Sequence, residues 1–232
     1  MKTFQELFDE HTGRGIIKWS HYPAIYDKHF WQYRDKEITI LEIGVQRGGS
    51  LEIWEKYFPK AKIYGIDLDE RCKGLTFDRA EVFIGDQTDK LFLTEVRKKI
   101  GPIDIIIDDG SHVPEHQRKS FEQLYMGMNS PGVYLVEDTE YNFVTADSQF
   151  MEHIDMERDF LNYRDGETQR ITNSITHYNN VVVIEKQHSN PVKLIKKNYL
   201  SSQQMKEKGI SFDIWTWQLP VNVLYNVYTL IF

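Results

Sequence analysis

Short apolar runs alternate with stretches of helical period along the chain as far as residue 138. Runs rich in β-branched residues and bounded by Gly, Pro or acids are typical of buried strands. Strands that alternate with helices in this way form parallel βαβ units. The pattern therefore predicts an α/β protein with a Rossmann-like, doubly wound and mostly parallel sheet, with ligands at the carboxyl ends of its strands. The predicted strands are Ile38–Val45, Lys62–Ile66, Ala80–Ile84, the run from Ile103 and Gly132–Val136, and the predicted helices are about Leu51–Phe58, Lys90–Ile100 and the segment between the last two strands.

Residues 1–37 carry aromatic and aliphatic residues at helical spacing, from Phe4 to Phe30. The sequence Thr12-Gly13-Arg14-Gly15 interrupts this pattern, so we expect two short helices joined by a turn, forming a helical N-terminal cap. Aromatic residues in such a segment more often serve packing than function. His21 and Tyr22 are nevertheless candidates for contact with a ligand.

The pattern after residue 138 predicts a hairpin, a lid and a C-terminal extension in place of further βαβ units. Ile171–His177 and Val181–Glu185 flank Tyr178-Asn179-Asn180 and are typical of an antiparallel hairpin. Residues 139–170 are polar and acidic without a clear period, which favours a substrate-side lid. We expect a core over residues 38–186 and a C-terminal extension over 187–232 that packs on this core or on a second copy of the chain.

Composition narrows the function classes. A chain of 232 residues suits one domain with a full core. Its net charge of −7 argues against a nucleic-acid partner, which needs a basic stripe. The single Cys72 excludes an internal disulfide framework and fits a reducing compartment. With neither a secretory signal nor an apolar run of about 20 residues in view, no membrane partner and a cytoplasmic location are expected, with a homo-oligomer as an option.

Acidic residues follow two neighbouring predicted strands. The run from Ile103 ends in Asp108-Asp109-Gly110-Ser111-His112, and Gly132–Val136 is followed by Glu137-Asp138. If these strands are adjacent and parallel, Asp109, Glu137 and Asp138 come together, since neighbouring strands are only ~4.8 Å apart. Carboxylates so close repel each other unless a proton or a cation neutralises them. A divalent metal with His112 beside it as a base is the functional interpretation, and a rim of separately solvated acids is the alternative.

The turn after the first strand follows the pattern Glu42-x-Gly44-x-x-x-Gly48-Gly49. Glycine lets the backbone approach a ligand, with helix N–H groups pointing at it. Gln46 stands where a dinucleotide motif has its second glycine, which disfavours pyrophosphate and permits a smaller ligand. Asp67, at the end of the next strand, is placed to accept ribose hydroxyls, and Asp86-Gln87 to meet an adenine edge. A tight turn without a ligand is the alternative interpretation.

These motifs together resemble those of the class I S-adenosylmethionine-dependent methyltransferases. The chain is most similar to the Mg²⁺-dependent sugar O-methyltransferases of macrolide and glycoside tailoring, with a frame shared by cephalosporin-hydroxylase-type proteins. The resemblance covers roughly Thr12 to Lys186. The motifs that carry it are Leu41-Glu42-Ile43-Gly44-Val45, Tyr57-Phe58-Pro59, Gly65-Ile66-Asp67, Gly85-Asp86-Gln87, Asp108-Asp109-Gly110-Ser111-His112 and Glu137-Asp138.

The resemblance also implies roles for residues. It implies Mg²⁺ on Asp109, Glu137 and Asp138, and His112 as the general base. The residues that it places around the methyl donor, S-adenosylmethionine, are Glu42, Gly44, Val45, Gly49, Ser50, Asp67, Asp69, Asp86, Gln87 and Asp108. The chain departs from the family after Lys186.

The chemistry fits these residue types. Methyl transfer is a displacement that depends on alignment of the acceptor oxygen with the donor methyl. A bound cation favours the alkoxide of an aliphatic hydroxyl, and all-oxygen ligands suit Mg²⁺. The expected function is metal-assisted O-methylation of a hydroxyl on a sugar or a glycosylated small molecule. The alternatives are a catechol-type phenol O-methyltransferase, a nucleotide-binding dehydrogenase, and a binding protein that keeps the frame without catalysis.

Overall fold

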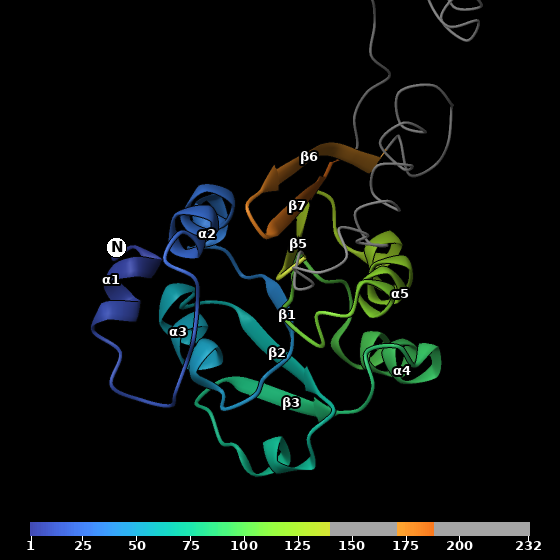
Figure 1. Ribbon diagram of the computed structural model, residues 1–232, viewed down its shortest axis with the longest axis horizontal. Coiled ribbons are helices and arrows are strands. Elements are labelled where there is room, and N and C mark those ends of the chain that lie inside the picture. Colours follow the sequence, from blue (N-terminus) through green and yellow to red (C-terminus); the bar gives the residue numbers. More distant parts are fainter. Residues whose placement is uncertain (140–170, 188–232) are drawn as a thin grey trace, which may run out of the picture. The chain divides into compact units, whose positions relative to one another are not determined.

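In the part of the chain that the structure describes, seven strands form one mixed sheet in the order β3-β2-β1-β4-β5-β7-β6 (Figure 1). The structure, a computed structural model, describes residues 1–139 and 171–187, which belong to the compact unit Met1–Pro191. Strands β1 to β5 pair in parallel, and β7 pairs antiparallel with both β5 and β6. The predicted parallel sheet with a C-terminal hairpin is thus confirmed. The strands are β1 (Thr39–Ile43), β2 (Lys62–Asp67), β3 (Ala80–Ile84), β4 (Ile105–Asp108), β5 (Gly132–Glu137), β6 (Thr172–Tyr178) and β7 (Val181–Lys186).

Helices cover both faces of the sheet, as Figure 1 shows. One core cluster joins the apolar side chains of the three N-terminal helices to one face of the sheet, and a second joins the other two helices to the opposite face. Successive strand residues alternate between these clusters, so that Ile107 packs in the first and Ile106 in the second. The helices are α1 (Phe4–Asp9), α2 (Tyr22–Phe30), α3 (Gly49–Tyr57), α4 (Lys90–Ile100) and α5 (Pro114–Leu124), with 3₁₀ turns at Trp31–Tyr33, Glu70–Gly74 and Tyr125–Gly127.

Local sequence explains where the helices begin. Thr3 and Glu6 form a capping box at the start of α1. The Asp89 side chain accepts hydrogen bonds from the first backbone N–H groups of α4. Pro114 stands in the first turn of α5, where its missing N–H costs no hydrogen bond.

Two predicted boundaries move at the glycine turn. β1 ends at Ile43 rather than Val45 because Gly44 has a φ of 94° and leaves the extended conformation. α3 begins at Gly49 rather than Leu51 because Gly48, in the left-handed conformation, serves as its N-cap residue. The turn is therefore shifted by two residues toward the N-terminus from its predicted place.

The N-terminal residues form the two predicted short helices, α1 and α2, which pack with α3 on one face of the sheet. The division into cap, core and extension remains a prediction. The lid predicted for 139–170 lies outside the described residues except for Thr139, and so does the extension beyond Gln187. Among the residues that the structure describes, no helix has the length and apolarity needed to cross a bilayer.

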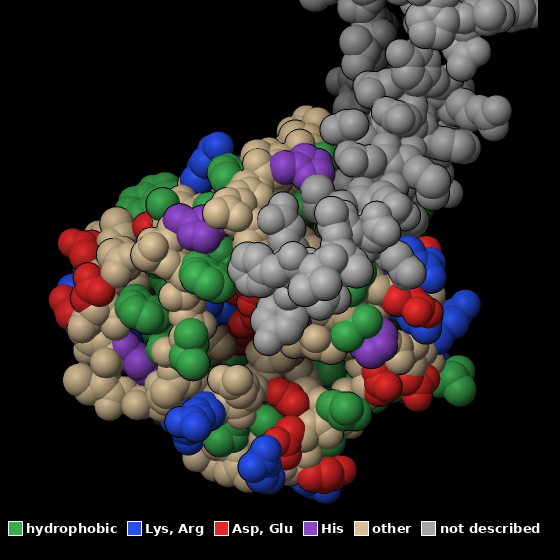
Figure 2. Space-filling view, viewed as in Figure 1, with side chains coloured by type: hydrophobic (Ala, Val, Ile, Leu, Met, Phe, Trp, Pro, Cys, Tyr) green, Lys and Arg blue, Asp and Glu red, His purple; other side chains and the backbone are tan. Residues whose placement is uncertain are grey.

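Charged side chains of both signs are interspersed on the face drawn in Figure 2. Lys and Arg (blue) stand among Asp and Glu (red) on this face rather than in one stripe. This surface does not have the uniform positive charge with which proteins bind a phosphate backbone.

Candidate metal and methyl-donor site

Asp109 and Glu137 lie at the ends of neighbouring parallel strands. The register pairs Asp108 of β4 with Val136 of β5, so the next residues on the two strands are adjacent. Side chains alternate along each strand, and Ile107 and Leu135 both face the cluster of the N-terminal helices. Asp109 and Glu137 therefore point toward those helices, whereas Asp108 points to the other face.

The position of Asp109 depends on the glycine turn. Its backbone N–H donates to Ile43 O at 2.9 Å, which extends the β1–β4 pairing by one residue. Its backbone carbonyl packs directly on Gly44, where a Cβ atom would stand only 1.9 Å from this oxygen. Gly44 is thus required for a close approach of two backbones, and this approach fixes Asp109 at the edge of the sheet.

Lys18 joins the two acids. This residue lies between α1 and α2, and its ammonium group donates to Asp109 Oδ2 at 2.6 Å and to Glu137 Oε2 at 2.7 Å. The side chain is 3% exposed. Burial lowers the pKa of Lys18, but the charges of Asp109 and Glu137 outweigh burial and raise it above its ordinary value. Sequence reasoning did not find Lys18; its signal was a single cation within the apolar stretch Ile16-Ile17-Lys18-Trp19.

Glu137 is fully buried and has a partner on each oxygen. The Tyr26 hydroxyl donates to its Oε1 at 2.6 Å, and Lys18 binds Oε2. Burial, followed by the charge of Asp109, raises the pKa of Glu137 to about 8, although Lys18 and Tyr26 oppose the shift. Burial also raises the pKa of Tyr26 well above its usual range, so the phenol remains a donor to Glu137.

Asp138 is held through one of its oxygens. Its Oδ1 accepts from the Tyr22 hydroxyl at 2.6 Å, from Trp19 Nε1 at 3.0 Å and from Asn180 Nδ2 at 2.7 Å. Tyr22, a candidate for ligand contact, thus binds a site carboxylate, while the His21 ring contacts the backbone carbonyl of Asn179. The loop before α2, the first residue of α2 and the β6–β7 turn together orient the carboxylate of Asp138.

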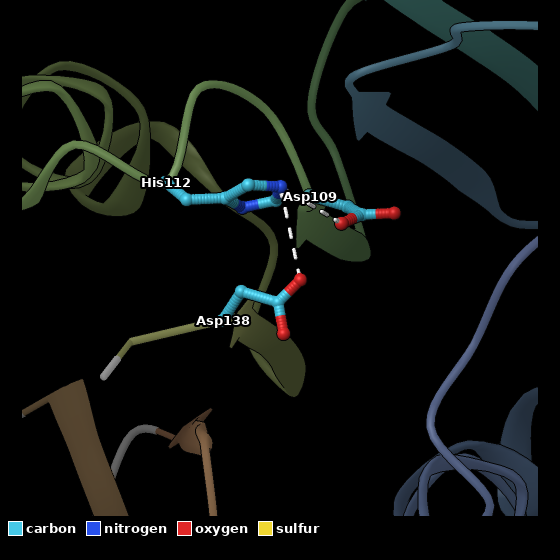
Figure 3. A group of neighbouring side chains, drawn as sticks. All are labelled: Asp109, His112 and Asp138. Carbon is cyan, nitrogen blue, oxygen red and sulfur yellow. Dashed lines mark ion pairs between the residues drawn. The ribbon is translucent and has the colours of Figure 1, made fainter. Parts of the chain in front are cut away.

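His112 lies between the remaining oxygens of the two aspartates (Figure 3). Its Nε2 is 3.9 Å from Asp109 Oδ1 and 3.7 Å from Asp138 Oδ2. The residue has a φ of 56°, a conformation that turns the chain after β4. One ligand atom from each of Asp109, His112 and Asp138 lies within 4.8 Å of the others.

The two carboxylate oxygens of each aspartate therefore have different surroundings. One oxygen is bound by the chain's own donors, and the other faces His112. Two carboxylate oxygens at this spacing suit Mg²⁺, which is usually held by one or two carboxylates and completes its shell with water or substrate oxygens. The donor set thus fits a hard divalent ion, and Glu137 adjoins it on the Lys18 side.

The glycine turn is bound to the end of β2. Asp67 Oδ2 accepts from the backbone N–H groups of Val45 and Gln46, at 2.8 and 2.7 Å. Gly49 packs against backbone carbonyls of residues 14 and 15, one of which would stand 2.5 Å from an added Cβ. Close backbone contacts within the protein thus explain these glycines, and their contact with a ligand remains a prediction.

Glu42 and Ser50 bind each other behind this turn. Ser50 Oγ donates to Glu42 Oε2 at 2.8 Å, and Trp54 Nε1 donates to Oε1 at 3.3 Å. Glu42 is completely buried, and burial raises its pKa to about 7 even though Lys18 acts in the opposite direction. Through these two hydrogen bonds the carboxyl group connects β1 to α3, the two elements that the turn joins.

The acids after β2 and β3 have local partners. Asp67 Oδ1 accepts from the backbone N–H of Asp69 at 2.8 Å, and Asp69 pairs with the exposed Arg71. Asp86 Oδ1 accepts from the backbone N–H of Thr88 at 2.7 Å. These contacts shape the turns that follow the strands, and the ribose and adenine contacts expected of these residues remain predictions.

Gln87 and Asp108 support the loop that carries His112. Gln87 Nε2 donates to Asp108 Oδ1 at 3.2 Å and to Ser120 Oγ at 2.9 Å, while its Oε1 accepts from Ser111 N at 2.9 Å. Burial raises the pKa of Asp108 to about 7. Both side chains are buried, so the amide of Gln87 is engaged inside the protein at the place where an adenine contact was predicted.

Several known proteins are similar to this chain in sequence and in fold. A rhamnosyl tetracenomycin-C 2'-O-methyltransferase of Streptomyces olivaceus is 37% identical over 141 residues, which are 57% of this chain and 37% of that protein. The demethylmacrocin O-methyltransferase of Streptomyces fradiae is 39% identical over 131 residues, 53% of this chain and 32% of that protein. No protein-family model matches the chain.

A solved structure extends the likeness to the fold. The MycE methyltransferase of the mycinamycin pathway, in complex with Mg, SAH and mycinamycin VI, matches with a TM-score of 0.72 and 29% identity over 84% of this chain and 57% of that chain. The chain spans about a third of the length of the two curated relatives. In sequence and in fold, the chain is thus related to the sugar O-methyltransferases among the class I S-adenosylmethionine-dependent enzymes, the group that its motifs resemble.

Proposed function

We propose that the chain is an S-adenosylmethionine-dependent, metal-assisted O-methyltransferase that acts on a hydroxyl group of a sugar or a glycosylated small molecule. The observation that carries the proposal is the group of Asp109, His112 and Asp138 at the ends of β4 and β5. The fold around it matches a methyltransferase solved with Mg, SAH and mycinamycin VI. The named relatives are O-methyltransferases of a rhamnosyl tetracenomycin-C and of demethylmacrocin.

Asp109, Glu137 and Asp138 would hold the divalent ion, Mg²⁺. When bound, the ion supplies Lewis acidity that favours the alkoxide form of the acceptor hydroxyl. Asp109 and Asp138 each turn one oxygen toward His112. Glu137 would offer the ion an oxygen on the side where Lys18 lies. Both aspartates are positioned by the chain's own hydrogen bonds before any ligand arrives.

His112 would accept the proton of the acceptor hydroxyl at Nε2. This atom faces the oxygens of Asp109 and Asp138 (Figure 3). A general base must lie within hydrogen-bond reach of the proton that it removes. A hydroxyl held between the two aspartates meets this condition.

The methyl donor would bind along the turn after β1 and the ends of β2 and β3. Gly44, Val45 and Gly49 form the turn, Glu42 and Ser50 support it, and Asp67 anchors it. The ends of parallel strands beside such a turn are where open α/β sheets bind nucleosides. Asp69, Asp86, Gln87 and Asp108 complete the proposed set.

Binding and turnover test the proposal separately. S-adenosylmethionine should raise the melting temperature of the protein, and NAD should not, because the turn lacks the second glycine that a pyrophosphate needs. Methyl transfer to a panel of glycosides should require Mg²⁺ and stop in excess chelator. A shift with NAD alone, or transfer only to phenols, contradicts the donor or the acceptor class.

The setting of the reaction is part of the proposal. The lone Cys72 and the glycosylated acceptors of the relatives support action in the cytoplasm on a small molecule, without a nucleic-acid or membrane partner. Gel filtration would reveal a homo-oligomer, which we keep as an option.

A further inference from the structure

Lys18 is enclosed by the acids and aromatic rings of the site. Its ammonium contacts one oxygen of Asp109 and one of Glu137, and it lies 6.0 Å from the centre of the Tyr26 ring. A charged group buried in this way is stable only when it is paired. Lys18 therefore stays in place because of the two acids, and the acids remain close together because Lys18 offsets their repulsion.

The oxygens that Lys18 contacts are those through which a divalent ion would gain Glu137 as a ligand. Glu137 Oε1 already accepts from Tyr26, and Oε2 accepts from Lys18. Mg²⁺ binds oxygen at about 2.1 Å and requires near-octahedral space, so it cannot share this position with an ammonium group. The two cations also repel each other strongly at such short range in a buried site.

We propose that Lys18 is an internal competitor for the divalent ion. Its ammonium offsets the negative charge shared by Asp109 and Glu137 in the ion-free protein, and the ion displaces it when Glu137 becomes a ligand. This inference rests on the divalent site of the proposed function. It assigns Lys18 a positioning role, which is to keep the acids assembled and to weaken ion binding.

The location of Lys18 allows such a displacement. The residue lies in the loop between α1 and α2, outside any helix or strand. Its neighbour Ile17 is 86% exposed, and Trp19, which donates to Asp138 Oδ1, is 57% exposed. The side chain can leave the site through a local rearrangement of this loop, without unpacking an element of the core.

Calorimetric titration with Mg²⁺ or Mn²⁺ tests the competition, without donor or acceptor. Lys18→Met removes the competing charge and should lower the dissociation constant of the ion by about tenfold or more. Lys60→Met is the matched control, because Lys60 is exposed just before β2 begins, at the opposite edge of the sheet. This control should bind the ion as the wild type does.

The outcomes separate this inference from the function on which it rests. Tighter binding by Lys18→Met, or binding by this variant alone, supports the competition. Equal or weaker binding by the variant, with normal binding by the wild type, overturns the competition and leaves the proposed function standing. Failure of both proteins to bind either ion overturns the metal site and the competition together.

A measurement on the wild type replaces the titration if Lys18→Met does not fold. Trypsin cleaves after lysine only when the residue is accessible, and the Lys18 side chain is 3% exposed. Addition of Mg²⁺ should increase cleavage after Lys18, because the displaced side chain enters solvent. Cleavage after Arg71, whose side chain is already 90% exposed, should stay constant. Unchanged or reduced cleavage after Lys18 contradicts the displacement.

Discussion

The backbone carbonyl of Asp109 occupies the space beside Gly44 where any other residue would carry its Cβ atom. The distance from that position to the oxygen is 1.9 Å, and Gly44 has a φ of 94°. A glycine that sequence motifs associate with a ligand therefore also sets the distance between the turn after β1 and the acidic loop after β4. The part of the proposed site that binds the methyl donor and the part that binds the metal are in direct backbone contact here.

Gly44→Ala should destabilise the protein and disturb the part of the site that binds the metal. The positive φ alone costs about 1–2 kcal/mol for a residue with a Cβ, and the clash with Asp109 adds to it. We expect a loss of at least about 2 kcal/mol in the free energy of unfolding by urea. Gly101→Ala is the control, since Gly101 has a φ of 80° but no atom within 4 Å of an added Cβ. Equal losses in the two variants would show that the contact with Asp109 is unimportant.

Glu42 should make the protein less stable as the pH rises. Burial raises the pKa of this carboxyl from 4.5 to about 7, so the folded state retains a proton that the unfolded state releases. Stability from this group is therefore present below about pH 4.5 and is lost as the pH rises toward 7. The loss is roughly 3 kcal/mol.

Glu42→Gln tests this dependence. The amide fills the same space beside Ser50 and Trp54 and does not titrate. Thermal unfolding between pH 5 and pH 8 should show a smaller decline in melting temperature for the variant than for the wild type. Parallel declines in the two proteins would exclude Glu42 as the source.

Removing Glu137 should lower the free energy of unfolding more when Lys18 is present than when Lys18 is absent. Glu137→Ala leaves Lys18 with one carboxylate and Tyr26 without its acceptor. Breaking a buried pair in this way costs about 3–5 kcal/mol. The double variant Lys18→Met/Glu137→Ala should recover part of the loss, as measured by urea unfolding in chelator. If the two single losses simply add in the double variant, the two side chains do not stabilise each other.

His112→Ala should abolish most activity while leaving donor binding intact. A general base contributes roughly 10²–10⁴-fold to the rate, and we expect kcat to fall within that range. The dissociation constant of S-adenosylmethionine should change little, since His112 faces Asp109 and Asp138. His177, exposed on β6, is the matched control for loss of an imidazole. A variant that keeps its wild-type kcat at every pH rules out the role of base.

Much of the fold and part of the site could be predicted because they depend on local patterns. The β-branched runs and the helix signals at Thr3, Asp89 and Pro114 are properties of short segments, and most of the predicted elements lie within two residues of those observed. The meeting of Asp109 with Asp138 followed from the rule that adjacent parallel strands end at the same edge.

Contacts between distant segments could not be predicted in this way. Lys18 binds acids that are 91 and 119 residues away in the sequence, and nothing in its own neighbourhood specifies the path of the loop that carries it. Asp108 turned inward because the alternation of side chains along β4 places it on the face opposite Asp109, and Gln87 donates a hydrogen bond to it there. That alternation is visible in the sequence once the first residue of the strand is known.

The sequence by itself therefore determined the sheet, the order of its elements and the acids at its edge, because hydrophobic period and strand topology are local or nearly so. Only the tertiary structure decided how those acids are neutralised. That outcome depends on how a loop packs across the sheet edge, and no periodicity in the chain encodes the packing.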